Sequence, residues 1–119
     1  MMLLYEAEAK GISVVEVVAA QVTPPDGLAT LLAEGVENNR EDLDAAISTH
    51  SKGWTMARMP ALDRTILRIA AFELMSRREV PVAVVLNEAI ELAKRFSTDD
   101  SSRFVNGVLA ALVPVLRAA

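Results

Sequence analysis

Apolar residues recur every three to four positions through the C-terminal part of the chain, which is the spacing of one buried face of an α-helix. Three such stripes follow one another, beginning near Pro60, near Pro81 and after the acidic, hydroxyl-rich segment 97–100. Proline suits the first turn of a helix, and Ser, Thr and Asp suit its cap. The pattern therefore predicts three long helices with these inward-facing residues: Leu62, Ile66, Ile69, Ala70 and Leu74; Val84, Val85, Ala89, Leu92 and Phe96; and Phe104, Val108, Ala111, Leu112 and Val115.

The N-terminal part is predicted to be helical in shorter pieces. Good helix formers run up to Gly11, a residue typical of a helix end, and apolar residues recur at helical spacing from Leu28 to Val36. A turn at Asn38 and Asn39 separates this helix from another over residues 41–50. Trp54 and Met56 follow in a loop, where we expect them to plug the edge of the core.

The segment 12–18 is ambiguous, because its β-branched residues are also typical of a strand. Ser13 and Glu16 have the spacing of a capping box, which favours a short helix. The Pro- and Gly-containing segment 21–27 is predicted to be a loop. Together the elements predict an all-α, compact bundle of about six or seven helices.

The composition of the chain restricts the functions that it can have. The chain has 119 residues and is 52% hydrophobic, which suits one domain over residues 1–119. It has no cysteine and a single histidine, His50, and it lacks the glycine-rich phosphate loops and the Gly-x-Ser-x-Gly elbow. We therefore expect no enzyme activity, no metal and no cofactor. No apolar run approaches the roughly 20 residues that span a bilayer, so a cytoplasmic protein without membrane contact is expected.

Charge divides the chain into two unequal halves. Residues 1–50 hold two basic and nine acidic residues, a net charge of −7, whereas residues 51–119 hold ten basic and seven acidic residues, a net charge of +3. A basic C-terminal part attracts anionic partners such as RNA. Ordinary solvated surface charge explains the same numbers, and the overall charge of −4 argues against strong non-specific binding of nucleic acid.

Four blocks of sequence closely resemble the NusB transcription antitermination family. They are residues 62–74 (LDRTILRIAAFEL), Val80-Pro81, residues 86–96 (LNEAIELAKRF) and residues 99–109 (DDSSRFVNGVL). Their order and spacing are those of the family, and a weaker likeness extends to Leu3-Leu4-Tyr5-Glu6, Gly35-Val36 and Gly53-Trp54. The resemblance implies an all-helical fold of two packed subdomains.

The same resemblance implies an RNA-binding adaptor. Members of this family pair with NusE, a small-subunit ribosomal protein, and the heterodimer binds the boxA element of ribosomal RNA leader transcripts. The complex then joins other Nus factors on RNA polymerase and supports processive transcription of ribosomal RNA.

The residues that match the family's contacts are candidates for the same roles here. Asp100, Arg103 and Phe104 match the RNA-binding start of the last helix, and Tyr5 and Asp63 match the partner surface. Arg103 suits a phosphate and an exposed Phe104 ring suits stacking on a base. Each has a structural alternative: core packing for Phe104, a helix cap for Asp100 and a helix-dipole contact for Asp63.

The chain departs from the family at its start, where an arginine-rich segment usually supplies RNA affinity. The first helical pattern is already under way at Met1, so we expect either that the sequence is truncated or that this member has lost the arm. Two other functions remain open: the NusB-like domain of an RNA methyltransferase, and a protein-interaction remnant without RNA binding. The oligomeric state, including a homodimer, is not determined by the sequence.

Overall fold

The computed structural model describes residues 2–14, 16, 27–51, 54–96 and 99–117. Every regular element in these ranges is a helix, which confirms the predicted all-α class. In chain order the elements are α1 (Met2–Lys10), α3 (Gly27–Asn38), α4 (Arg40–Thr49), the short 3₁₀ helix η1 (Met56–Arg58), α5 (Ala61–Ser76), α6 (Val82–Phe96) and α7 (Asp99–Leu116).

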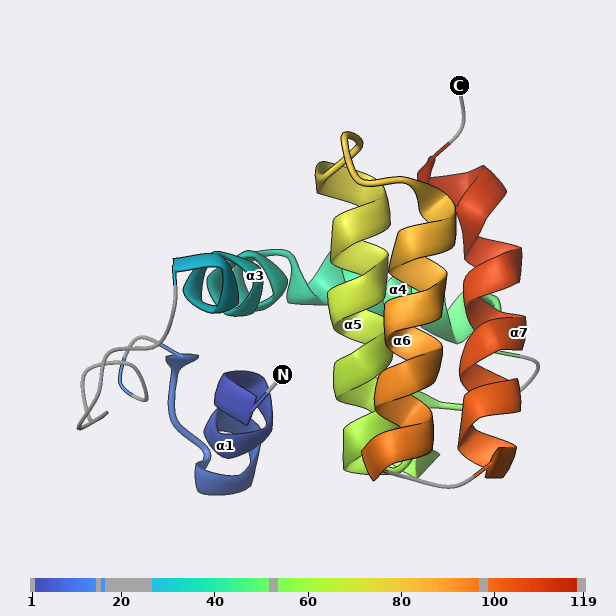
Figure 1. Ribbon diagram of the computed structural model, residues 1–119. Coiled ribbons are helices and arrows are strands. Elements are labelled where there is room, and N and C mark those ends of the chain that lie inside the picture. The colour runs from blue at the N-terminus through green and yellow to red at the C-terminus, as the bar shows by residue number, and fades with distance from the viewer. Residues whose placement is uncertain (1, 15, 17–26, 52–53, 97–98, 118–119) are drawn as a thin grey trace.

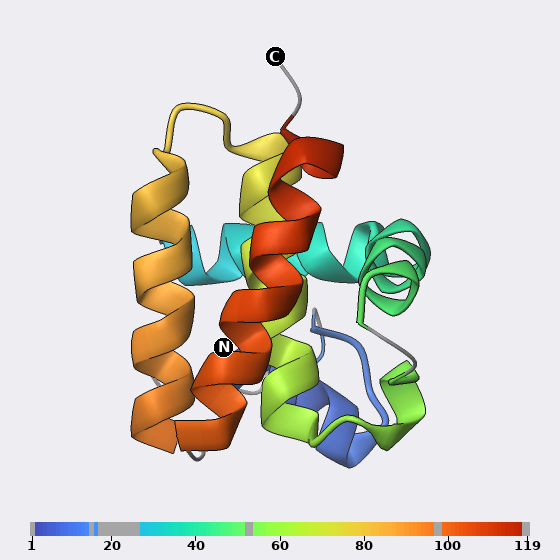
Figure 2. The ribbon, with the colours of Figure 1, turned by 90° about the vertical axis from the view of Figure 1, so that its right-hand side faces the viewer.

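The three C-terminal helices stand side by side, and α4 crosses behind them (Figure 1). In the view turned by 90°, α5 lies between α7 and the N-terminal helices (Figure 2). All residues from 65 to 74 are therefore buried, as is Asp63 in the first turn of α5. The main core gathers around α5 and draws its apolar side chains from α3 through α7.

A second, smaller core joins α1 to α3. It consists of Leu3, Ala7, Val14 and Ala33, and Leu4 packs against both cores. Gly11 ends α1 with a φ of +67°, a left-handed conformation that favours glycine. The two cores agree with the two packed subdomains that the family resemblance implies.

The capping prediction for the segment after α1 is confirmed in part. The Glu16 amide donates to the Ser13 hydroxyl over 3.1 Å, as a Ser cap requires. The Val14 amide donates to Glu37 of α3 over 2.7 Å, which fastens this turn to the smaller core. Residue 15, residues 17–26 (most of the predicted 21–27 loop) and residues 52–53 (part of the predicted helix break) lie outside the described residues.

The predicted inward faces of α6 and α7 were partly wrong. Val84 and Phe96 of α6 are 42% and 44% exposed, and Val115 of α7 is 53% exposed. The buried positions are instead Val85, Ala89 and Ala93 on α6, and Ser101, Ser102, Val105, Val108, Leu109 and Leu112 on α7. A periodic pattern gives the width of an apolar stripe, but contact with α5 decides which edge of it is covered.

A glycine inside a helix often allows close helix packing, but Gly107 of α7 does not mark such a contact. A Cβ atom built there meets nothing within 4 Å. Close packing occurs at Gly35 of α3, where a Cβ atom would lie 2.2 Å from Cζ of Phe72. Gly35 is therefore the position at which the absence of a side chain lets α3 approach α5.

No helix within the described residues is long and apolar enough to cross a membrane.

Candidate nucleic-acid interface

The start of α7 carries two exposed, oppositely charged side chains. Asp100 and Arg103 lie one turn apart, and an Arg103 nitrogen is 3.6 Å from Oδ1 of Asp100. Their side chains are 92% and 78% exposed, so solvent screens this pair strongly. The Arg103 guanidinium therefore gains little from the pair and is accessible to a phosphate.

Beside these charges lies an aromatic pair. The rings of Trp54 and Phe104 are in an edge-to-face arrangement, with centroids 6.0 Å apart and planes inclined at 61°. Trp54 is 49% exposed and Phe104 is half-buried against the main core. The core-packing alternative for Phe104 is thus confirmed in part, because the ring packs on the core while remaining partly exposed, and stacking on a base stays a prediction.

Trp54 was missed as a candidate binding residue. It was expected to plug the edge of the core, yet half of it is exposed. Met56, on η1, does pack against the core as expected. A lone tryptophan between a helix break and a proline was a signal for a surface ring, but only the contact with Phe104 shows where that ring lies.

Two hollows flank the aromatic pair. One has a volume of about 210 Å³ and the other about 240 Å³, and both are lined by Trp54 and Phe104. The first is completed by Pro60, Asp63, Asp100 and Ser101, and the second by His50, Ser51, Arg103, Gly107, Val108 and Ala111. The start of α7 and η1 lie at the same end of the bundle, which brings these distant segments together (Figures 1 and 2).

Asp63 occupies an unexpected position. It was predicted to lie off the apolar stripe of α5, but it is 3% exposed. Its Oδ2 accepts a hydrogen bond of 3.0 Å from the Ser101 hydroxyl of α7. Its Oδ1 is the one buried side-chain oxygen or nitrogen, in the described part of the chain, that has no hydrogen-bond partner.

Four of the five predicted site residues thus gather at one end of the bundle, and Tyr5 lies elsewhere. Tyr5 is 37% exposed on α1, which packs against α3 and α5. It lines neither hollow. The structure therefore separates a surface at the start of α7 from a second one on α1.

A partly buried ion network, centred on the buried Arg68, holds α1 to the bundle. Arg68 of α5 makes two contacts with Asp44 of α4, of 2.8 and 3.0 Å, and a third of 3.2 Å with Glu8 of α1. Arg64 also binds Glu8, and it donates to the carbonyl of Met59 over 2.8 Å. Loss of Glu8 would remove one of the two acids that pair with the buried Arg68 guanidinium, so the network fixes how α1 docks.

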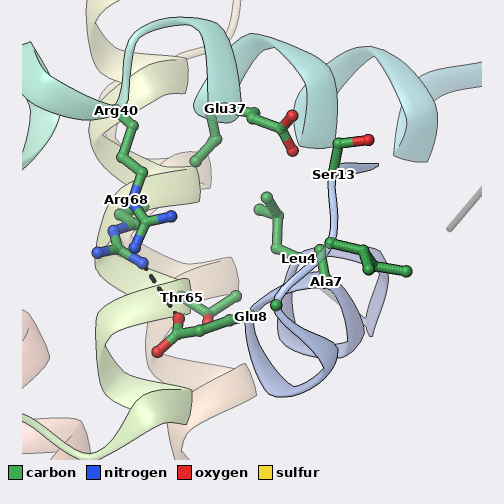
Figure 3. Close-up of a pocket in the computed structure, with 11 residues that line it drawn as sticks. Leu4, Ala7, Glu8, Ser13, Glu37, Arg40, Thr65 and Arg68 are labelled. Atoms are coloured by element: carbon green, nitrogen blue, oxygen red, sulfur yellow. Dashed lines mark hydrogen bonds and ion pairs between the residues drawn. The ribbon is translucent and has the colours of Figure 1, made fainter. Parts of the chain in front are cut away.

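A further hollow adjoins this network. Figure 3 shows it between α1, the turn at Ser13, the start of α4 and α5, with a volume of about 400 Å³. Arg40 and Arg68 line it together with the carboxylates of Glu8 and Glu37. Arg68 pairs with Glu8, Glu37 accepts a hydrogen bond from the Val14 amide, and Arg40 pairs with Asp44. Because these charges are mixed and each is engaged within the fold, the hollow has the character of a structural seam.

His50 makes a local contact at the end of α4. Its Nδ1 lies 2.9 Å from the carbonyl oxygen of Ala46, one turn earlier. This contact is typical of a histidine at a helix end.

The fold and this surface define a helical protein with a partly exposed aromatic pair beside an accessible arginine. Comparison with known proteins gives the family. The NusB family model matches residues 6–114. The transcription antitermination protein NusB of Saccharopolyspora erythraea is 45% identical over 118 residues, which is 94% of this chain and 80% of that protein.

The solved structures agree with this result. T. maritima NusB is similar with a TM-score of 0.82 and 29% identity, over 94% of this chain and 83% of that one. A chain from the crystal structure of the antitermination factors NusB and NusE in complex with double-stranded RNA has the same fold, with a TM-score of 0.80 and 23% identity, over 95% of this chain and 89% of that one. The chain belongs to the NusB family.

Proposed function

We propose that this chain is a transcription antitermination factor that binds boxA RNA as a heterodimer with NusE and acts in the cytoplasm by binding alone, without catalysis. Membership of the NusB family supports the role in transcription antitermination. The observation that carries RNA binding is the Trp54–Phe104 pair next to the exposed Arg103. Rings that stack on bases and a cation that meets phosphate are the two elements of single-strand binding.

The RNA surface of this proposal comprises Asp100, Arg103, Phe104 and Trp54. Arg103 contacts the backbone and the two rings contact unstacked bases. Asp100 lies beside Arg103, and its negative charge weakens the attraction of Arg103 for phosphate. Asp100 therefore tunes the affinity for RNA.

The partner surface of this proposal is centred on Tyr5. The acidic first half of the chain suits a basic ribosomal protein. Asp63 stays a predicted partner contact, although its carboxylate is buried between α5 and α7. Assembly with RNA polymerase and other Nus factors follows from the same family membership, and a single domain over residues 1–119 remains part of the proposal.

The test is a titration of boxA RNA at two salt concentrations, with and without NusE. Arg103→Ala should weaken binding and reduce the dependence of log K on log salt by about 0.7 for single-stranded RNA. Thermal stability should stay within about 0.5 kcal/mol, because exposed ion pairs contribute little. Arg95→Ala is the matched control, since Arg95 is an exposed arginine of α6 that lines neither hollow beside Trp54.

Absence of binding under every condition would refute the proposal for this chain. Equal losses for Arg103→Ala and Arg95→Ala would show that only overall charge matters. Tyr5→Asp tests the partner surface, because a new carboxylate within an apolar contact disfavours association. Unchanged NusE affinity in this variant would remove Tyr5 from the interface.

A further inference from the structure

The apolar contact between α1 and the rest of the molecule is small. Among the described residues, the smaller core holds four buried side chains, and α1 supplies Leu3 and Ala7 to it. Leu4 is only partly buried and packs against both cores. Next to this contact lies the hollow of about 400 Å³ that separates part of α1 from α5 (Figure 3). The side of α1 that faces the bundle is therefore incompletely packed.

Glu8 is the side chain through which α1 reaches the arginines of α5. Its carboxylate binds Arg64, and it binds Arg68 over 3.2 Å. Arg68 has a second partner on the bundle, since it makes contacts of 2.8 and 3.0 Å with Asp44. Arg64 likewise donates to the carbonyl of Met59 over 2.8 Å. Each arginine thus keeps a partner when Glu8 leaves, so the bundle face stays intact and can receive α1 again.

The chain that follows α1 has the features of a hinge. Gly11 ends the helix with a φ of +67°, and glycine adopts many other backbone conformations without strain. The next turn is fastened to α3, because the Val14 amide donates to Glu37 over 2.7 Å and the Val14 side chain is fully buried. α1 can therefore turn about Gly11 while the segment beyond it stays on α3.

We propose that α1 exchanges between a docked and a released position about Gly11, that Glu8 is the latch of the docked position, and that NusE recognises only this position. Glu8 is then a positioning residue for the partner contact of Tyr5. The inference rests on the proposed NusE surface. A free helix of nine residues is not stable in water, so a released α1 does not hold Tyr5 in place for a partner.

The first experiment is hydrogen exchange of the unmodified chain, followed by mass spectrometry in low concentrations of urea. The amides of α1 should exchange at least about tenfold faster than those of residues 66–74 of α5, because release of α1 does not require global unfolding. Release also exposes little surface. Exchange in α1 should therefore depend weakly on urea, whereas exchange in α5 should depend on it strongly.

The latch is tested by Glu8→Gln in the same measurement. This variant should accelerate exchange in α1 by about tenfold, the order expected when a charge-assisted pair is weakened. Glu6→Gln is the matched control, since it removes the same charge from the same helix. Glu6 pairs with Lys10 of α1 itself, over 2.7 Å, so its loss should change the exchange of α1 by about twofold or less.

The second experiment adds NusE and one thiol. The chain has no cysteine, so Ala7→Cys introduces a single reactive group. Ala7 is 6% exposed in the smaller core, and a thiol there reacts with a labelling reagent when α1 leaves α3. NusE at ten times its Kd should slow this reaction about elevenfold if NusE binds docked α1 alone. Hydrogen exchange needs no variant, so release is tested even where Ala7→Cys disturbs the smaller core.

The outcomes separate this inference from the proposed function. Exchange of α1 in the same urea-dependent step as α5 would overturn release, and equal acceleration by Glu8→Gln and Glu6→Gln would remove Glu8 as the latch. Labelling that NusE does not slow, in a complex that forms, would show that NusE binds without docked α1. Failure of the unmodified chain to bind NusE would refute the proposed partner and the coupling together, whereas release and the latch would still be decided by exchange.

Discussion

Arg117 fastens the end of the chain to the central helix, and we expect Arg117→Ala to destabilise the fold strongly. Its guanidinium donates to four backbone carbonyls: Nε to Leu74 over 3.0 Å, Nη2 to Glu73 and to Arg77 over 2.8 Å each, and Nη1 to Val80. These carbonyls belong to the last turn of α5 and the segment after it, and those of Glu73 and Arg77 also accept backbone hydrogen bonds from Arg77 and Val80. One side chain therefore caps α5 and ties α7 to it.

The magnitude follows from the contacts. A hydrogen bond to a charged group contributes about 1.5–3 kcal/mol to stability, but four that share one partly exposed side chain are not additive, and the freed carbonyls can turn to water. We therefore expect a loss of about 2–4 kcal/mol for Arg117→Ala, a large part of the roughly 5–15 kcal/mol of a typical domain. Arg117→Lys should retain only part of the stability that Arg117→Ala loses, because the lysine ammonium is a single compact donor group.

The assay is thermal unfolding followed by circular dichroism at 222 nm. A loss of this size corresponds to a fall in Tm of roughly 8–15 °C for a chain of this length. Arg95→Ala, an exposed site on α6, is the control and should change Tm by about 2 °C or less. A fall for Arg117→Ala no larger than that of the control would refute the role of this guanidinium.

Two further predictions concern a buried acid and the glycines. Burial, and next the charge of Glu88, raise the pKa of Glu73. The folded state then holds this proton more tightly than the unfolded state. Its contribution to stability is therefore complete below the ordinary pKa of 4.5 and is lost as pH rises through the raised pKa. Glu73→Gln should therefore raise Tm at pH 7 more than at pH 4, and an equal change at both would contradict this. Gly35→Ala must displace the Phe72 ring and should destabilise by about 1–3 kcal/mol in urea unfolding. Gly107→Ala, whose Cβ meets open space, should stabilise by about 0.5–1 kcal/mol, and equal effects of the two substitutions would refute the packing argument.

The sequence by itself determined the helical class and the approximate limits of the helices. Local signals suffice for this, because apolar spacing, prolines and capping residues act within a few positions. Gly11, Pro81 and the acidic start of α7 all marked a helix boundary that the structure has. The four sequence blocks were also sufficient to indicate the family, since they carry order and spacing over residues 62–109.

The tertiary structure alone decided which side of each helix is covered and which residues meet. Asp63 was expected to lie off the apolar stripe, but α7 packs over it and supplies Ser101 as a partner. Trp54 became a surface ring only because the segment before α5 lies beside Phe104, which is 50 positions later in the sequence. Such contacts depend on the relative rotation and distance of whole helices, and no local pattern encodes those quantities.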